Sequence, residues 1–106
     1  MVAINVDYIH SSIKKFIDNL DSETKASVMH AIHELSVYGN DLTLPISKYI
    51  GQKLFELRIT KPINVRIIYT FQNNQAWILN IFKKKSSKIP KREIELALQR
   101  GRMLVD

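Results

Sequence analysis

The sequence predicts an α+β fold with two N-terminal helices, an antiparallel sheet of three to four strands and a C-terminal helix. Two observations carry this prediction. Apolar residues recur at helical spacing in the first third of the chain, whereas from residue 53 they alternate with polar ones. The chain has 106 residues, of which 45% are hydrophobic, enough for one small core. We therefore expect residues 1–106 to form a single domain.

Two successive helices are predicted by apolar residues at helical spacing, first Ile9, Ile13, Phe16, Ile17 and Leu20, and then Val28, Ala31, Ile32 and Leu35. Asp21 or Ser22 can cap the second helix, and Gly39 with Asn40 can end it. The simplest arrangement is an antiparallel pair. A very short strand is expected before these helices, around residues 2–5.

Three β-strands are predicted from β-branched and aromatic residues at 53–60, 65–71 and 76–82. A loop containing Pro62 connects the first two. Asn73 and Asn74 connect the second and third, because asparagine tolerates the positive φ of a two-residue hairpin turn. The sheet is therefore expected to be an antiparallel meander.

Positive charge is concentrated in the second half of the chain. Residues 1–52 hold four Lys/Arg and six Asp/Glu, net −2, whereas residues 53–106 hold twelve and four, net +8. The stretch FKKKSSKIPKRE at 82–93 leads from the last strand into the last helix, which Pro90 can begin. Such asymmetry indicates a polyanionic partner such as nucleic acid, less so an anionic membrane or an acidic protein segment. A solvated lysine surface that keeps the protein soluble is an equal alternative.

The hairpin turn also predicts which side chains share a face of the sheet. Counting from Asn73–Asn74 gives the cross-strand pairs Gln72 with Gln75, Ile68 with Leu79, and Arg66 with Ile81. Lys83 would then lie diagonally beside Arg66, and Arg58 would lie opposite Arg66. Two facing arginines repel each other unless Glu56, on the same face, or a bound phosphate offsets their charge. The alternatives are thus a phosphate site and a solvated or Glu56-paired surface.

Several functional classes are excluded or disfavoured. The chain has no cysteine, which excludes a cysteine nucleophile, disulfides and thiolate metal sites. Its three glycines offer no phosphate-binding glycine loop, and no run of about eighteen apolar residues predicts a membrane helix. His30, His33 and Glu34 match no metal-ligand signature. We expect a cytoplasmic protein without metal or cofactor.

The segments GQKLFELRI, VRIIYTF and AWILNIFKKKSSKIPKREIELALQR resemble the HigB toxins of the phage-derived Gp49-like family, within the RelE superfamily of bacterial toxins. FIDNLDSETKASVMHAIHELSVYGNDL is similar to the two helices of that family. The resemblance implies a RelE-like fold and the toxin of a type II toxin-antitoxin module. It also implies mRNA cleavage, in many relatives only on the ribosome, and silencing by a HigA-like helix-turn-helix antitoxin.

The same resemblance implies site residues. The basic site of the family corresponds to Arg58, Arg66, Lys83, Lys84 and Lys85, with Lys88 beside them. The arginines would hold the phosphate, and one of the three consecutive lysines would act as the base. The general acid and base are otherwise unassigned, since the predicted basic face offers only Glu56.

Further RNA contacts are expected from Lys91 and Arg92 in the first turn of the last helix. Tyr49, expected in the loop before the sheet, could stack on a base or cover the core. Two other functions share this architecture: a ParE-like toxin directed at gyrase that is no nuclease, and a catalytically silent RNA-binding homologue. The FKKxxxKxP junction favours the nuclease.

Overall fold

The structure, a computed structural model, describes residues 3–104. Its elements follow in the order β1 (Val6–Tyr8), α1 (Ser11–Asp18), α2 (Ser22–Tyr38), the 3₁₀ turn η1 (Gly39–Asp41), β2 (Ser47–Gly51), β3 (Leu54–Ile59), β4 (Val65–Gln72), β5 (Gln75–Lys83) and α3 (Lys91–Gly101). The two N-terminal helices, three of the strands and the C-terminal helix were predicted. β2 was not.

All five strands form one sheet in the order β1-β5-β4-β3-β2. Each neighbouring pair is antiparallel except β1, which runs parallel to β5. The prediction of a purely antiparallel sheet of three to four strands was therefore wrong. The N-terminal strand was expected at residues 2–5 but lies at Val6–Tyr8; residue 2 is outside the described residues.

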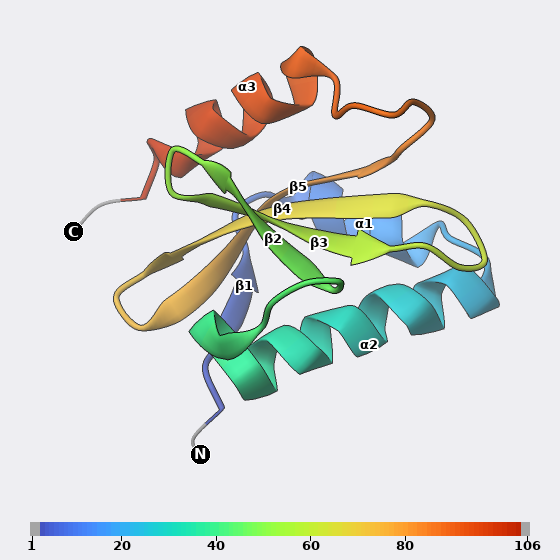
Figure 1. The fold of residues 1–106 in the computed structure, drawn as a ribbon, viewed down its shortest axis with the longest axis horizontal. Helices are drawn as coiled ribbons and strands as arrows, with labels where there is room; N and C mark the ends of the chain where they lie inside the picture. The colour runs from blue at the N-terminus through green and yellow to red at the C-terminus, as the bar shows by residue number, and fades with distance from the viewer. Residues whose placement is uncertain (1–2, 105–106) are drawn as a thin grey trace.

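The sheet forms the middle layer between the helices, with α2 along one side and α3 along the other (Figure 1). One apolar cluster joins Ile13 and Ile17 of α1 and Leu35 of α2 to the sheet. A smaller cluster joins Ala97 of α3 to the opposite face through Ile68. Both faces of the central strands are consequently buried.

Local signals explain the ends of the helices. Asp21 caps α2 as predicted, because its side chain accepts a hydrogen bond from the Thr24 backbone N–H at 3.1 Å. Gly39 ends the helix at φ +52°, a conformation that glycine adopts readily. Pro90 is the residue before α3, where its fixed φ suits the entry into a helix.

The sheet has two tight turns, and only one of them consists of residues that favour a turn. Asn73 and Asn74 have φ of 55° and 61°, so the predicted hairpin turn is confirmed. Gln52 and Lys53 turn between β2 and β3 with φ of 54° and 65°. Neither residue favours positive φ, and this explains why the second hairpin was missed.

The register of β5 changes at an extra residue. Gln72 pairs with Gln75 as predicted, and Tyr69 pairs with Ile78, but Ile68 then pairs with Asn80 because Leu79 is inserted as a β-bulge. The predicted pairing of Ile68 with Leu79 was therefore wrong. Arg66 lies opposite Phe82 instead of Ile81.

The same shift moves Lys83. Lys83 pairs with Val65, which precedes Arg66 in β4. The side chains of Val65 and Lys83 therefore lie on the face of the sheet opposite to that of Arg66. The expectation that Lys83 lies beside Arg66 on the same side of the sheet was thus wrong. A bulge of one residue reverses the face of every side chain beyond it.

The bulge is bonded to α3. Arg100 Nη1 donates to the Leu79 carbonyl at 2.8 Å, and its Nη2 donates to Ser12 Oγ at 3.2 Å. Asn80 Nδ2 donates to the carbonyl of Glu93 at 3.1 Å. These contacts tie α3 to β5 and to the start of α1.

We expect Arg100→Ala to lower the free energy of unfolding by about 1–3 kcal/mol, because the carbonyl of the buried Leu79 loses its charged donor. Urea unfolding measures this, with Arg102→Ala, an exposed arginine two residues further along the chain, as the control. Equal stability of the two variants would show that Arg100 does not hold the bulge.

Candidate functional site

Two arginines face each other across neighbouring strands. Arg58 of β3 and Arg66 of β4 are direct cross-strand partners, so their side chains share the α3 face of the sheet, as the sequence predicted. Glu56 lies on that face too, and its carboxylate is 3.6 Å from Arg58 Nε and 3.5 Å from Arg66 Nε. These three side chains together carry a net charge of +1, from two cations and one anion.

The two arginines differ in exposure. Arg66 is 4% exposed and Glu56 5%, whereas the side chain of Arg58 is 34% exposed. Arg66 Nη1 is bonded to the carbonyls of Ile59 at 3.1 Å and Val65 at 3.3 Å. Arg66 thus forms the floor of the site, and Arg58 is the arginine that an incoming anion can reach.

Burial lowers the pKa of the Arg66 guanidinium; the Glu56 carboxylate opposes this shift, and the positive charge of Arg58 adds to it. Among the described residues, the Nε atoms of Arg58 and Arg66 are buried without a hydrogen-bond partner. Both Nε atoms face the Glu56 carboxylate at 3.5–3.6 Å, so an anion such as a phosphate would approach the other donors of Arg58, the more exposed arginine.

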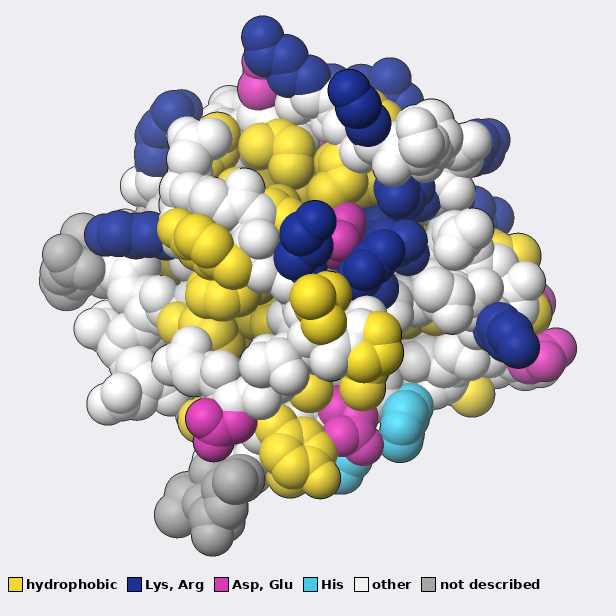
Figure 2. Space-filling view, in the orientation of Figure 1, with side chains coloured by type: hydrophobic (Ala, Val, Ile, Leu, Met, Phe, Trp, Pro, Cys, Tyr) yellow, Lys and Arg dark blue, Asp and Glu magenta, His cyan; other side chains and the backbone are white. Residues whose placement is uncertain are grey.

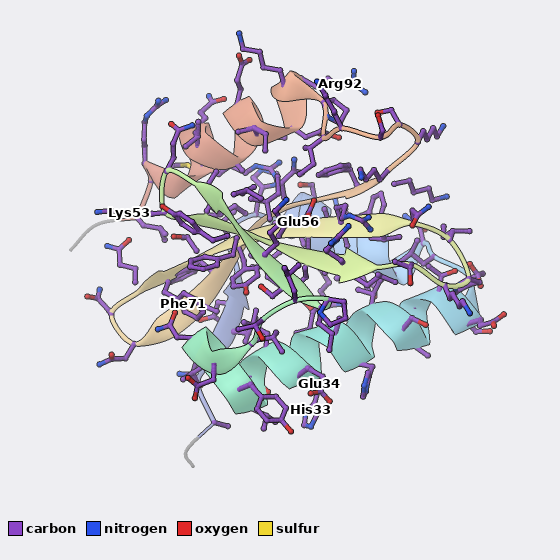
Figure 3. All side chains as sticks on the ribbon, viewed as in Figure 1. His33, Glu34, Lys53, Glu56, Phe71 and Arg92 are labelled. Carbon is purple, nitrogen blue, oxygen red and sulfur yellow. The ribbon has the colours of Figure 1, made fainter. Side chains whose placement is uncertain are left out.

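A lysine that the sequence did not indicate belongs to the same face. Lys48 of β2 is the cross-strand partner of Glu56 and is exposed. Figure 2 shows acidic atoms at the centre of this face with basic side chains on both sides, and Figure 3 places Glu56 there. Lys48 was missed because β2 was missed. We call Lys48, Glu56, Arg58 and Arg66 the arginine cluster.

The other predicted lysines lie at the end of β5 and in the connection to α3. Lys83, Lys85 and Lys88 are exposed, and Lys84 is half-buried, its backbone N–H bonded to the Asn64 carbonyl at 3.0 Å. None of these four is a cross-strand neighbour of Arg58 or Arg66 on the α3 face.

In α3, Lys91 is exposed and within 3.7 Å of Glu95, and Arg92 is exposed at the start of the helix (Figure 3). Tyr49 does not lie in a loop, as expected, but in β2. It is the cross-strand partner of Phe55, and the two rings are 5.1 Å apart. Tyr49 therefore belongs to the face opposite the arginine cluster.

One histidine, His30, is closer to the arginine cluster than the sequence indicated. His30 and Glu34 of α2, 3.4 Å apart, line a hollow of about 420 Å³ together with Arg58 and Lys61. This hollow is created by the packing of α2 along β3, and no local sequence pattern predicts it. Among residues 3–104, no three His, Asp or Glu side chains gather as metal ligands.

Residues 15–102 match the family described as phage derived protein Gp49-like (DUF891). No curated protein matches the chain. No helix within the described part of the chain is long and apolar enough to cross a membrane.

We expect Glu56→Gln to reduce stability by about 3 kcal/mol, because it leaves the buried Arg66 without its counter-charge. Glu95→Gln, which alters an exposed ion pair, should change stability by less than about 1 kcal/mol. Thermal melts measure both. Added phosphate should raise the melting temperature of Glu56→Gln more than that of the parent, since an anion replaces the lost carboxylate. Equal responses to phosphate would count against an anion site at the arginine cluster.

Proposed function

The chain belongs to the phage-derived Gp49-like family, and on this premise we propose that it is the toxin of a bacterial type II toxin-antitoxin module, similar to HigB in the RelE superfamily. We propose further that it is an endoribonuclease that cleaves mRNA, on the ribosome, in the cytoplasm. The observation that carries the nuclease proposal is the arginine cluster, in which two arginines and Lys48 share one face with a single carboxylate and Arg58 is partly open to solvent.

RNA cleavage requires stabilisation of negative charge and the transfer of two protons. In metal-free RNA cleavage the ribose 2′-hydroxyl attacks the adjacent phosphorus, the bond to the 5′-oxygen breaks, and a 2′,3′-cyclic phosphate remains. One proton leaves the 2′-hydroxyl and one joins the leaving oxygen. Negative charge gathers on the non-bridging oxygens, where each preorganised donor contributes about 2.7–4 kcal/mol.

Arg58 is suited to the first of these tasks. Its side chain is partly exposed, so its guanidinium can approach a phosphate, and the planar fork can donate to two oxygens. Arg66 lies beneath it and keeps a second positive charge at the site. Its hydrogen bonds to two backbone carbonyls fix that charge in place. Arg66 would therefore stabilise the negative charge of the phosphate without contacting it directly.

The remaining basic residues are proposed to bind the RNA backbone. Lys83, Lys85, Lys88, Lys91 and Arg92 are exposed along the connection and the start of α3. Lys83, Lys84 and Lys85 stay our candidates for the proton acceptor, as the resemblance implies. The proposed partners are mRNA, the ribosome and a HigA-like helix-turn-helix antitoxin; no cofactor is proposed.

The function is tested by inducing the protein in bacterial cells and mapping mRNA 5′ ends by primer extension. New 5′ ends within translated regions should appear within minutes of induction and disappear when the antitoxin is co-expressed. Growth arrest with intact transcripts and damaged DNA would replace the nuclease with a gyrase-directed toxin. RNA binding without cleavage would indicate a silent homologue.

For the site, we expect Arg58→Ala to lower single-turnover cleavage about 10²-fold to 10³-fold while weakening ribosome binding much less, because its donors act on charge that develops in the transition state. Arg66→Ala should lose a similar factor, and its melting temperature must be measured alongside because Arg66 is buried. The double change Lys91→Ala with Arg92→Ala should weaken binding and leave single-turnover cleavage nearly intact. Parental cleavage by a folded Arg58→Ala variant would remove Arg58 from the catalytic residues.

A further inference from the structure

A second hollow lies next to the arginine cluster, where α1, the end of β5 and the start of α3 meet. Its volume is about 500 Å³, within the range of about 300–1,000 Å³ usual for small-ligand sites. Phe16, Phe82 and Pro90 form its apolar wall. Because Phe82 is the cross-strand partner of Arg66, this hollow begins one strand away from the arginines. We call it the α1–α3 hollow.

The apolar wall includes an accessible aromatic ring. Phe16 is half-buried in α1, and it packs against the larger apolar cluster while also lining the hollow. Aromatic rings that are partly open to solvent next to cations are the usual stacking platforms for unpaired bases of single-stranded RNA.

Cations surround the opening. Lys83, Lys85 and Arg92 line the hollow, and all three are exposed. They come from the end of β5, the connection and α3, so the fold gathers them from three segments. A phosphate on either side of a bound base can therefore meet a positive charge.

One acceptor in the hollow is held in place. Glu93 lines the hollow, and its carboxylate accepts from Asn80 Nδ2 at 3.3 Å. Asn80 is itself 5% exposed and fixed, because its Oδ1 accepts from the Ile81 backbone N–H at 2.9 Å. Neither residue takes part in the proposed cleavage. A fixed carboxylate in a largely apolar hollow is an acceptor for N–H groups.

We propose that the α1–α3 hollow receives one unpaired base of the RNA, stacked on Phe16, and that Glu93 selects guanine. This inference rests on the proposed function in taking RNA as the ligand. Guanine presents two adjacent donors, N1–H and the 2-amino group, to a carboxylate. Uracil presents one N–H between two carbonyl oxygens, which a carboxylate repels. β5, whose Phe82 lines the hollow, lies two strand spacings, about 10 Å, from β3, so a base held there would position the RNA strand over Arg58.

The test compares two short single-stranded RNAs, an all-uracil oligomer and the same oligomer with one guanine, by fluorescence anisotropy at one salt concentration. The parent should bind the guanine oligomer more tightly. Phe16→Ala should weaken that binding about 5-fold to 150-fold, the range for loss of one stacked base. Glu93→Gln should bind both oligomers alike, because an amide can donate to uracil as well as accept from guanine. Tyr38→Ala, which removes an exposed aromatic ring at the end of α2, should bind as the parent does.

Phe16 also packs in the core, so Phe16→Leu is the second variant; it keeps apolar bulk and removes the aromatic face. If Phe16→Leu binds as tightly as the parent and Glu93→Gln still prefers guanine, the inference is overturned. The outcome is separable from that of the proposed function. Cleavage of mRNA by the parent without base selection refutes only the base-binding role of the hollow. Guanine-selective binding without any cleavage refutes only the nuclease proposal.

Discussion

Leu79 and Asn80 are neighbours in β5, yet both contact α3, and this is possible only because the strand bulges there. Leu79 packs in the apolar cluster with Ala97, and Asn80 bonds to Glu93. In a regular strand one of the two would point to the opposite face. The bulge thus joins the sheet to α3, puts Phe82 beside Arg66, and orients the carboxylate of the α1–α3 hollow. The attachment of α3 and the composition of the α1–α3 hollow depend on this one insertion.

The arginine cluster imposes an electrostatic constraint of its own. Moving two guanidinium groups and a carboxylate out of water is unfavourable, and ion pairs at 3.5–3.6 Å recover only part of that free energy. Replacing such buried ion pairs by well-packed apolar residues is often neutral or stabilising. The cluster is therefore better explained by what it binds than by what it adds to stability, and a bound anion would offset the positive charge that Glu56 leaves unbalanced.

Local chemistry decided which parts of the fold and site could be predicted. Asn73–Asn74 carries its turn type in its sequence, so the pairing nearest that turn was correct, and the short loop containing Pro62 brought Arg58 opposite Arg66. Gln52–Lys53 adopts the same kind of turn without the residues that favour it, so β2 and with it Lys48 were missed. The bulge was not predictable, because it is stabilised by α3, which is distant in sequence. The α1–α3 hollow joins Phe16 to Glu93, residues that no spacing rule connects.

The parallel strand at the edge of the sheet has a consequence for synthesis. β1 pairs with residues 76–78 of β5, so the first strand of the chain has no partner until most of the chain has been made. Contacts this distant in sequence close late in folding. The hydrogen bond from Arg100 to Ser12 Oγ closes later still, once α3 has left the ribosome. A nascent chain of this protein therefore has no complete sheet until β5 has left the ribosome, and no bond between α1 and α3 until α3 has left it as well.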